Sequence, residues 1–132
     1  NGKILSIDLK KIDPIDKVEF VEGDFTKNST QQNIKNYFKS KVDVVISDMA
    51  ENTTGIKNVD STSTGELCKE AMFFAKDVLF KNGIFVSKIF MGSSFNEIIL
   101  NSKSIFKETK VFKPNSSRKE SKESFIICKF LR

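Results

Sequence analysis

Three polar residues that could do chemistry end or interrupt apolar runs of the sequence. Asp48 closes the run 42–47, Lys88 lies inside a second run and Glu123 opens a third. A lysine in a buried strand is costly unless charged partners meet it. In an open α/β sheet the strand ends converge on one crevice, where ligands bind. We therefore interpret an acid–lysine–acid cluster, assembled from three strands, as the candidate reaction centre.

Each candidate also has a purely structural interpretation. Lys88 could be a strand lysine whose amine reaches solvent along its aliphatic stem, and Glu123 could be a solvated charge at a strand start. Asp8 and Asp24, two acids that follow short apolar segments, could simply cap turns. The sequence contains no histidine, so acid–base chemistry has to use Lys, Asp, Glu or Tyr. This excludes triads and metal sites that need histidine, and we expect no metal.

The composition is typical of one globular domain. The chain has 132 residues, of which 39% are hydrophobic and 30% charged, enough for a single core. Its net charge of +5 suggests a polyanionic partner such as nucleic acid, although a generally basic proteome gives the same balance. Cys68 and Cys128 lie in apolar surroundings and are expected to be buried, reduced thiols, as in a reducing compartment. With no apolar run near the about 20 residues of a membrane span and no signal peptide pattern, we expect a cytoplasmic protein.

The elements that position these residues alternate between strands and helices. Strands are predicted at 3–9, 18–22, 42–47, 84–90, 109–112 and 124–130, and helices at 28–40, at 95–106 and between a cap at Thr62 or Thr64 and a stop at Asn82-Gly83. Segments 51–63 and 113–123 are predicted to be loops. The continuously apolar run 42–47 is typical of a parallel strand covered on both faces. Alternation followed by two strands without an intervening helix predicts a doubly wound α/β sheet with a closing hairpin.

Several segments occur in the order of one known family's motifs. They are IDL, DPI and GDF at 7–9, 13–15 and 23–25, SDMAENTTG at 47–55, VSKIFMG at 86–92 and KPNSSRKESKE at 113–123. In these motifs the chain resembles the FtsJ/RrmJ (RlmE-type) family of ribosomal RNA large-subunit 2′-O-ribose methyltransferases. It departs from the SDMAP motif at Glu51, where proline is usual. The resemblance implies a Rossmann-like methyltransferase sheet with helices on both faces and a C-terminal antiparallel hairpin.

The resemblance also implies roles for individual residues. Asp48, Lys88 and Glu123 fall on three members of the family's Lys-Asp-Lys-Glu catalytic tetrad, with Lys88 on the proton acceptor. Asp8 matches the acid that binds the ribose hydroxyls of S-adenosylmethionine, as an acid after the second strand does in dinucleotide-binding folds. Asp24 matches the acid near the adenine amino group, and Asp48 also lies beside the methionine moiety.

The family's first tetrad lysine and its glycine-rich cofactor loop have no counterpart in residues 1–132. The family places them with its first strand, ahead of the segment that matches Asn1 and between the strands that match 3–9 and 42–48. Without that strand two internal sheet edges would be unpaired. The expectation is therefore that residues 1–132 are the C-terminal portion of a single S-adenosylmethionine-dependent methyltransferase domain. Alone, they are expected neither to bind the cofactor tightly nor to turn over.

Methyl transfer from a sulfonium to a ribose hydroxyl is an in-line displacement, which needs alignment and help in removing the hydroxyl proton. Lys88 can help in two ways. As a neutral amine, favoured by desolvation, it would be the base. As an ammonium ion, favoured by Asp48 and Glu123, it would orient the hydroxyl and stabilise the developing alkoxide. The sequence leaves both open.

The loop that carries the last motif is rich in cations. Lys113, Arg118 and Lys122 are the preferred RNA-binding residues because such clusters neutralise phosphates; the alternative is a merely solvated hairpin loop. The resemblance implies S-adenosylmethionine-dependent 2′-O-methylation of a uridine ribose in 23S ribosomal RNA, with the large ribosomal subunit as partner and a monomeric enzyme. The alternatives are a 2′-O-methyltransferase of transfer RNA or an mRNA cap, an inactive RNA-binding or ribosome-assembly protein of this fold, and a nicotinamide-dependent dehydrogenase. The last would need a glycine-rich loop, which these residues lack.

Overall fold

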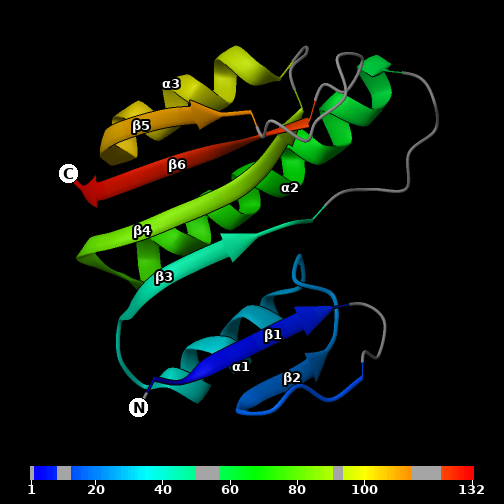
Figure 1. Ribbon diagram of the computed structural model, residues 1–132, viewed down its shortest axis with the longest axis vertical. Coiled ribbons are helices and arrows are strands. Elements are labelled where there is room, and N and C mark those ends of the chain that lie inside the picture. The colour runs from blue at the N-terminus through cyan, green and yellow to red at the C-terminus, as the bar shows by residue number, and fades with distance from the viewer. Residues whose placement is uncertain (1, 9–12, 50–56, 91–93, 114–122) are drawn as a thin grey trace. The chain divides into compact units, whose positions relative to one another are not determined.

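A computed structural model describes residues 2–8, 13–49, 57–90, 94–113 and 123–132 (Figure 1). For residues 57–64, 90 and 123 it describes the backbone alone. The chain divides into two compact units, residues 1–41 and 42–132, and each is described by itself. Within the described residues, no helix combines the length and the apolar character that a membrane crossing requires.

The first unit contains a parallel pair of strands and one helix. Strands β1 (Ile4–Asp8) and β2 (Val18–Glu22) pair along their whole length, with Asp8 opposite Glu22. Helix α1 (Asn28–Phe38) ends at Lys39, which takes the left-handed conformation with φ 57°. Thr30 and Ile34 are the buried residues of this helix. The described part of the unit therefore has only a small apolar interior.

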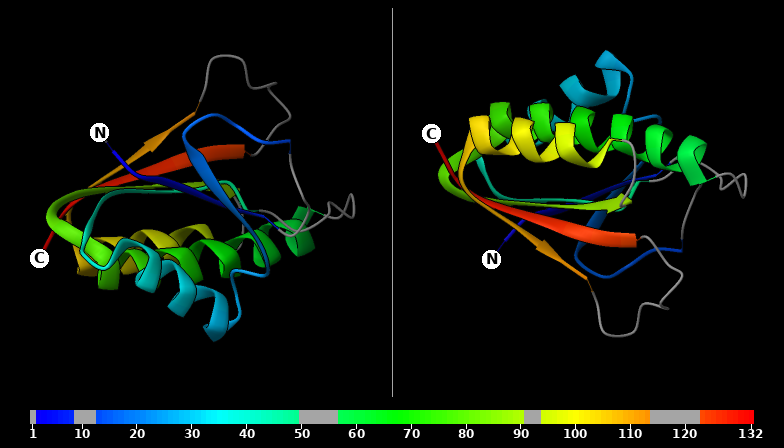
Figure 2. Two further views of the ribbon diagram at one scale, coloured as in Figure 1. Left: turned by 90° about the horizontal axis from the view of Figure 1, so that it is seen from below. Right: turned by 90° about the horizontal axis from the view of Figure 1, so that it is seen from above.

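The second unit is a four-stranded sheet in the order β3-β4-β6-β5. The elements are β3 (Val42–Ser47), α2 (Lys57–Val78), β4 (Leu79–Phe90), α3 (Phe95–Ile105), β5 (Phe106–Phe112) and β6 (Glu123–Leu131). Strands β3 and β4 are parallel, whereas β6 runs antiparallel to both β4 and β5. Helices α2 and α3 cover the same face of this sheet (Figure 2). The predicted α/β class with two C-terminal antiparallel strands is confirmed.

The core of the second unit lies between the sheet and these two helices. Phe85 and Ile89 of β4 are fully buried, and so are Ile126 and Cys128 of β6. Alternate residues of a strand point to opposite faces. Val86 and Lys88 of β4 therefore point away from α2 and α3. On that open face Val44 and Ile46 are 48% and 71% exposed. Within the described part of residues 42–132 only one face of strand 42–47 is covered, so the prediction of a strand covered on both faces is wrong for this unit.

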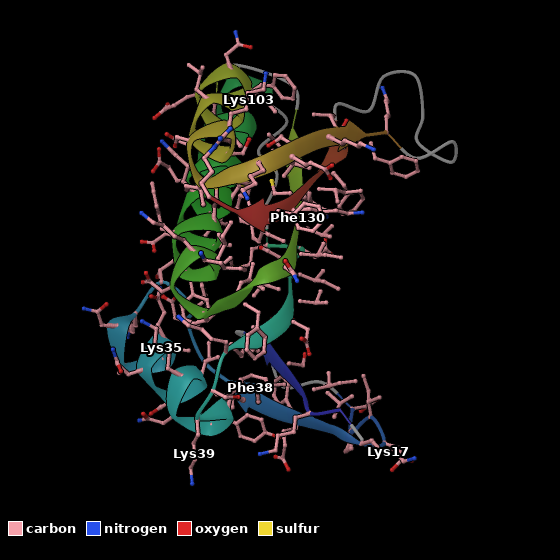
Figure 3. All side chains as sticks on the ribbon, turned by 90° about the vertical axis from the view of Figure 1, so that its left-hand side faces the viewer. Lys17, Lys35, Phe38, Lys39, Lys103 and Phe130 are labelled. Carbon is pink, nitrogen blue, oxygen red and sulfur yellow. The ribbon has the colours of Figure 1, made fainter. Side chains whose placement is uncertain are left out.

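The alternation ends near the last residues of β6. Phe130 has φ 64° (labelled in Figure 3), a left-handed conformation that is uncommon for a residue other than glycine. Beyond it, Leu131 pairs with Phe106. Phe106 is fully buried and its ring lies parallel to that of Phe85, with centroids 6.2 Å apart. The first residue of β5 thus lies in the core.

The boundaries of α2 differ from the prediction for identifiable reasons. The helix begins at Lys57, ahead of the predicted cap at Thr62 or Thr64. Gly65 lies inside it, where an added Cβ would be 2.6 Å from Cβ of Ser94, so this glycine permits close packing against the residue that precedes α3.

The predicted stop at Asn82-Gly83 is also wrong, because β4 starts at Leu79 and contains both residues. A Cβ on Gly83 would lie 2.9 Å from the carbonyl oxygen of Phe80 and 3.1 Å from that of Asp43. This glycine therefore allows a close approach of backbone within and beside β4. The other predicted elements are confirmed in type, with small differences at their ends.

Candidate active site

Lys88 and Asp48 form an ion pair at the ends of two parallel strands. The Lys88 Nζ and Asp48 Oδ1 atoms are 2.9 Å apart. Ser47 pairs with Ser87 in the parallel ladder of β3 and β4, so Asp48 and Lys88 are the next residues of each strand. The lysine side chain is only 17% exposed, whereas the carboxylate is 73% exposed. The structure thus brings two of the three predicted residues together, with the amine enclosed and its partner facing solvent.

Position 123 lies close to this pair in the register of the sheet. Lys88 is opposite Phe125, and Phe90 is opposite Glu123. Glu123 is thus two residues along β6 from the position that faces Lys88. Its side chain is outside the described part of the chain, so its contact with the amine stays a prediction.

Two buried serines lie directly behind the ion pair. Ser47 and Ser87 are 6% and 1% exposed. The Ser87 hydroxyl donates a hydrogen bond to the carbonyl oxygen of Lys88, at 3.1 Å. Among the described residues the buried Ser47 hydroxyl has no hydrogen-bond partner, and such a loss typically costs about 1–3 kcal/mol. Sequence reasoning did not single out this residue, because an unpaired hydroxyl cannot be recognised before the packing around it is known.

The two acids predicted to hold a cofactor lie at one edge of the small parallel sheet. Asp8 ends β1, and its carbonyl oxygen accepts a hydrogen bond from the backbone N–H of Gly23, at 2.8 Å. Asp24 Oδ1 accepts hydrogen bonds from the hydroxyl and the backbone N–H of Thr26, at 2.6 and 2.9 Å. These bonds lower the pKa of the Asp24 carboxyl, the hydroxyl bond having the larger effect. Asp24 therefore does cap a turn through one oxygen, as the structural interpretation held, and presents an ionised carboxylate to solvent.

The predicted RNA-binding residues are described only in part. Lys113 follows β5 and is exposed. Arg118 and Lys122 lie outside the described residues, as do residues 50–55 of the motif that begins at Ser47. Their roles stay predictions.

The cysteines take no part in this site. Both Cys68 and Cys128 are free and buried, as predicted. Burial raises the pKa of the Cys68 thiol, and it raises that of Cys128 to about 12. Because the thiolate is the reactive form, neither side chain is suited to act as a nucleophile near neutral pH.

Comparison with known proteins decides the family. The family described as FtsJ-like methyltransferase matches residues 1–131. The chain belongs to that family. Over 132 residues this FtsJ-like chain is 63% identical to ribosomal RNA large subunit methyltransferase E of Pelagibacter ubique (strain HTCC1062), covering 100% of the chain and 65% of that protein. It is 46% identical over 128 residues to the protein of the same name from Rickettsia akari (strain Hartford), covering 97% of the chain and 56% of that protein. The chain therefore spans less than two thirds of the length of either relative.

Solved structures agree with the fold of this FtsJ-like chain. A Plasmodium falciparum protein provisionally named a ribosomal RNA methyltransferase superposes with a TM-score of 0.85 at 27% identity, over 99% of the chain and 73% of that protein. A Streptococcus mutans protein provisionally named a methyltransferase, solved in complex with SAH, gives a TM-score of 0.58 at 11% identity, over 98% and 72%. The second likeness shows the fold alone. Together they confirm the methyltransferase-type α/β fold.

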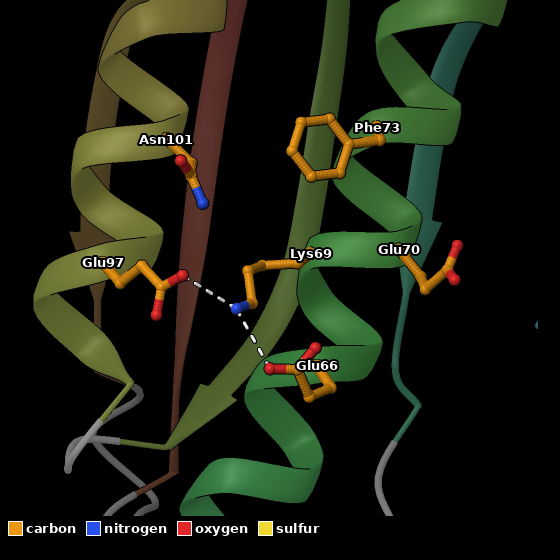
Figure 4. A pocket seen from close by; sticks show the side chains of 6 residues that line it. All are labelled: Glu66, Lys69, Glu70, Phe73, Glu97 and Asn101. Atoms are coloured by element: carbon orange, nitrogen blue, oxygen red, sulfur yellow. Dashed lines mark hydrogen bonds and ion pairs between the residues drawn. The ribbon is translucent and has the colours of Figure 1, made fainter.

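A groove of about 410 Å³ between α2 and α3 is distinct from the ion pair of this FtsJ-like chain (Figure 4). Its lining residues are Glu66, Lys69, Glu70, Phe73, Glu97 and Asn101. Lys69 Nζ lies 2.9 Å from Glu97 and 3.0 Å from Glu66, and these carboxylates raise the pKa of Lys69, Glu97 having the larger effect. With three glutamates and a single lysine among its lining residues, the groove is unsuited to a polyanion. Lys69 is better explained as a bridge that ties α2 to α3.

Proposed function

We propose that the protein is an S-adenosylmethionine-dependent methyltransferase that methylates the 2′-hydroxyl of a uridine ribose in 23S ribosomal RNA of the large ribosomal subunit. The observation that carries the proposal is the Lys88 side chain, which is only 17% exposed and is paired with Asp48 near the carboxyl ends of β3 and β4. Membership of the FtsJ-like family supports the reaction class. The relatives named ribosomal RNA large subunit methyltransferase E support the substrate class.

The side chains at the edge of the β1–β2 pair fit S-adenosylmethionine, which when bound supplies an electrophilic methyl group on a sulfonium. Asp8, whose carboxylate is exposed at a strand end, would accept hydrogen bonds from the ribose hydroxyls. Asp24, held ionised by Thr26, keeps Oδ2 available as an acceptor for the adenine amino group. Asp48 would lie beside the methionine moiety as well as the amine of Lys88.

The ion pair favours one of the two roles for Lys88 in the resting protein. A carboxylate 2.9 Å away favours the ammonium form. An ammonium ion can donate a hydrogen bond to the 2′-oxygen and stabilise the negative charge that develops on it as the C–O bond forms. We assign Lys88 first to this electrostatic role, with acceptance or relay of the hydroxyl proton as the second. Glu123 is assigned as the third member of the cluster, two residues along β6 from the position opposite Lys88.

Contacts with RNA phosphates are assigned to Lys113, Arg118 and Lys122. Lys113 is exposed at the end of β5, and the net charge of +5 agrees with a polyanionic partner. The proposal includes a monomeric, cytoplasmic enzyme that uses no metal. It also treats residues 1–132 as the C-terminal portion of one methyltransferase domain.

The test is transfer of a radiolabelled methyl group from S-adenosylmethionine to purified ribosomal subunits by the full-length protein. The expected result is label in large-subunit RNA, recovered after alkaline hydrolysis in a uridine-containing dinucleotide, because a 2′-O-methyl group blocks cleavage at that position. Label in transfer RNA or capped RNA instead would favour the related enzymes. Binding of RNA without any transfer would favour an inactive assembly protein.

A further inference from the structure

A row of cross-strand neighbours runs from the candidate reaction centre to the edge of the sheet. Lys88 of β4 is opposite Phe125 of β6, and Phe125 is opposite Phe112 of β5. Directly opposite residues of an antiparallel pair share a face of the sheet. Ile126, the next residue of β6, is fully buried beneath the helices, so this row belongs to the other face, which α2 and α3 leave open (Figure 2).

The outer end of the row is an exposed aromatic ring. Phe112 is 55% exposed, and Phe125 is half-buried between it and Lys88. Neighbouring strands lie about 4.8 Å apart, so Phe112 is about 10 Å from Lys88 at the level of the backbone. That spacing would suit a group that is linked to the reacting ribose but does not itself react.

The charges around Phe112 indicate what that group is. Lys110 lies two residues before Phe112 and Lys113 directly follows it, and both lysines are exposed. Single-stranded RNA is bound by this combination, because bases stack on aromatic rings while cations neutralise the phosphates. Phe73 of α2 provides an internal contrast, since it is 50% exposed but lines the groove that contains Glu66, Glu70 and Glu97. Its surroundings repel phosphate.

We propose that Phe112 is a stacking platform for a base of single-stranded RNA next to the nucleotide whose ribose reaches Lys88. Phe125 lies between Lys88 and Phe112 on the same face of the sheet, beneath the RNA strand. Lys110 and Lys113 contact the flanking phosphates. The inference rests on the proposed function and adds to it a residue that sets where the substrate strand lies.

The test uses the full-length protein and a short single-stranded RNA with 2-aminopurine beside its single uridine. Stacking quenches 2-aminopurine fluorescence, so binding to the wild type is expected to lower the emission. Phe112→Ala should abolish the quenching and weaken binding about tenfold, whereas Phe112→Trp should keep both. Phe73→Ala, a matched change of an equally exposed ring, should leave both unchanged. With ribosomal subunits as substrate, Phe112→Ala should raise KM while kcat stays within about twofold of the wild type, since it removes binding that is equal in ground and transition states.

Three outcomes overturn the inference. The first is wild-type quenching and KM in Phe112→Ala, and the second is an equal loss in Phe73→Ala. The third is a wild type that neither binds nor methylates RNA, in which case the proposed function fails too. Methylation by the wild type together with an unchanged KM in Phe112→Ala defeats the inference alone. Should Phe112→Ala fold poorly, Phe112→Leu keeps the apolar bulk and lacks the aromatic face, so the same expectations apply to it.

Discussion

The two units hold their functional candidates by different physical means. In residues 42–132, Lys88 and Asp48 stand at the end of a sheet whose other face is packed against two helices. In residues 1–41, Ile34 is the one apolar side chain of the described residues that is buried, and Asp24 is held by hydrogen bonds within its own turn. The proposed reaction centre therefore depends on a packed core, whereas the acids assigned to the cofactor depend mainly on local hydrogen bonds.

Truncation of a buried side chain should give the largest difference in stability between the two units. Phe85→Ala removes a fully buried ring that packs against Phe106, and should lower the free energy of unfolding by about 3–5 kcal/mol. Ile34→Ala in α1 should cost about 2 kcal/mol or less, near the bottom of the range for such truncations, because few buried neighbours surround it. Urea denaturation of each variant measures both values. Equal losses would show that the first unit has a core as extensive as the second.

Removing one carboxylate charge from each unit should affect different steps. Asp48→Asn should lower kcat about 10²–10³-fold, because it removes the charge that holds the Lys88 amine in place. Asp8→Asn should weaken S-adenosylmethionine binding about tenfold and leave kcat at saturation nearly unchanged, since it acts on the ground and transition states alike. Steady-state kinetics and calorimetric titration separate these results. A loss of kcat in Asp8→Asn would show that Asp8 affects the chemical step and not only cofactor binding.

Glycine substitutions test how tightly each unit is packed. Gly65→Ala should destabilise the protein by about 1–3 kcal/mol, despite the better helix propensity of alanine, because the new methyl group would lie 2.6 Å from Cβ of Ser94. Gly23→Ala is the matched control, since its methyl group would meet Thr30 at an ordinary 3.4 Å. Thermal unfolding should place Gly23→Ala within about 0.5 kcal/mol of the wild type. A tolerated Gly65→Ala would mean that α2 and Ser94 can separate without cost.

The smallest expected effect is a titration in the first unit. Thr26→Val removes a hydroxyl donor from Asp24 and should raise the pKa of that carboxyl toward its ordinary value of 3.8. A carboxyl whose pKa is lowered in the folded protein stabilises the fold at pH values above its ordinary pKa. This contribution is lost as the pH falls through the pKa of the folded state. The wild type should therefore lose this small contribution below about pH 3.8, and Thr26→Val should have less to lose. Carbon-13 NMR titration of the Asp24 side-chain carboxyl measures its pKa. An unchanged pKa in Thr26→Val would mean that another neighbour, and not the Thr26 hydroxyl, lowers it.

The sequence predicted the helices and strands, and it predicted the strand ends at which Asp48 and Lys88 lie. Asp48 could be placed because it directly follows the apolar strand 42–47, and Lys88 because it interrupts the next parallel strand. Their contact followed from parallel strand ends meeting at one edge. Asp8 and Asp24 were singled out through the resemblance to the family, and it is the structure that shows both at one edge of the β1–β2 pair.

Features that depend on packing between distant segments could not be predicted. The need for glycine at position 65 becomes evident only when Ser94 is placed beside it. The row from Lys88 through Phe125 to Phe112 depends on register, and a shift of one residue would turn Phe112 to the opposite face. The exposure of Val44 and Ile46 likewise depends on which face the helices cover, which apolar composition alone does not determine.

The most direct test of the account is methyl transfer by Lys88→Ala in the full-length protein, measured with radiolabelled S-adenosylmethionine and large ribosomal subunits. Transfer is expected to fall at least about 10²–10⁴-fold, while the calorimetric affinity for the cofactor stays within a few-fold of the wild type. Wild-type turnover in Lys88→Ala would contradict the assignment of the Lys88–Asp48 pair as the reaction centre.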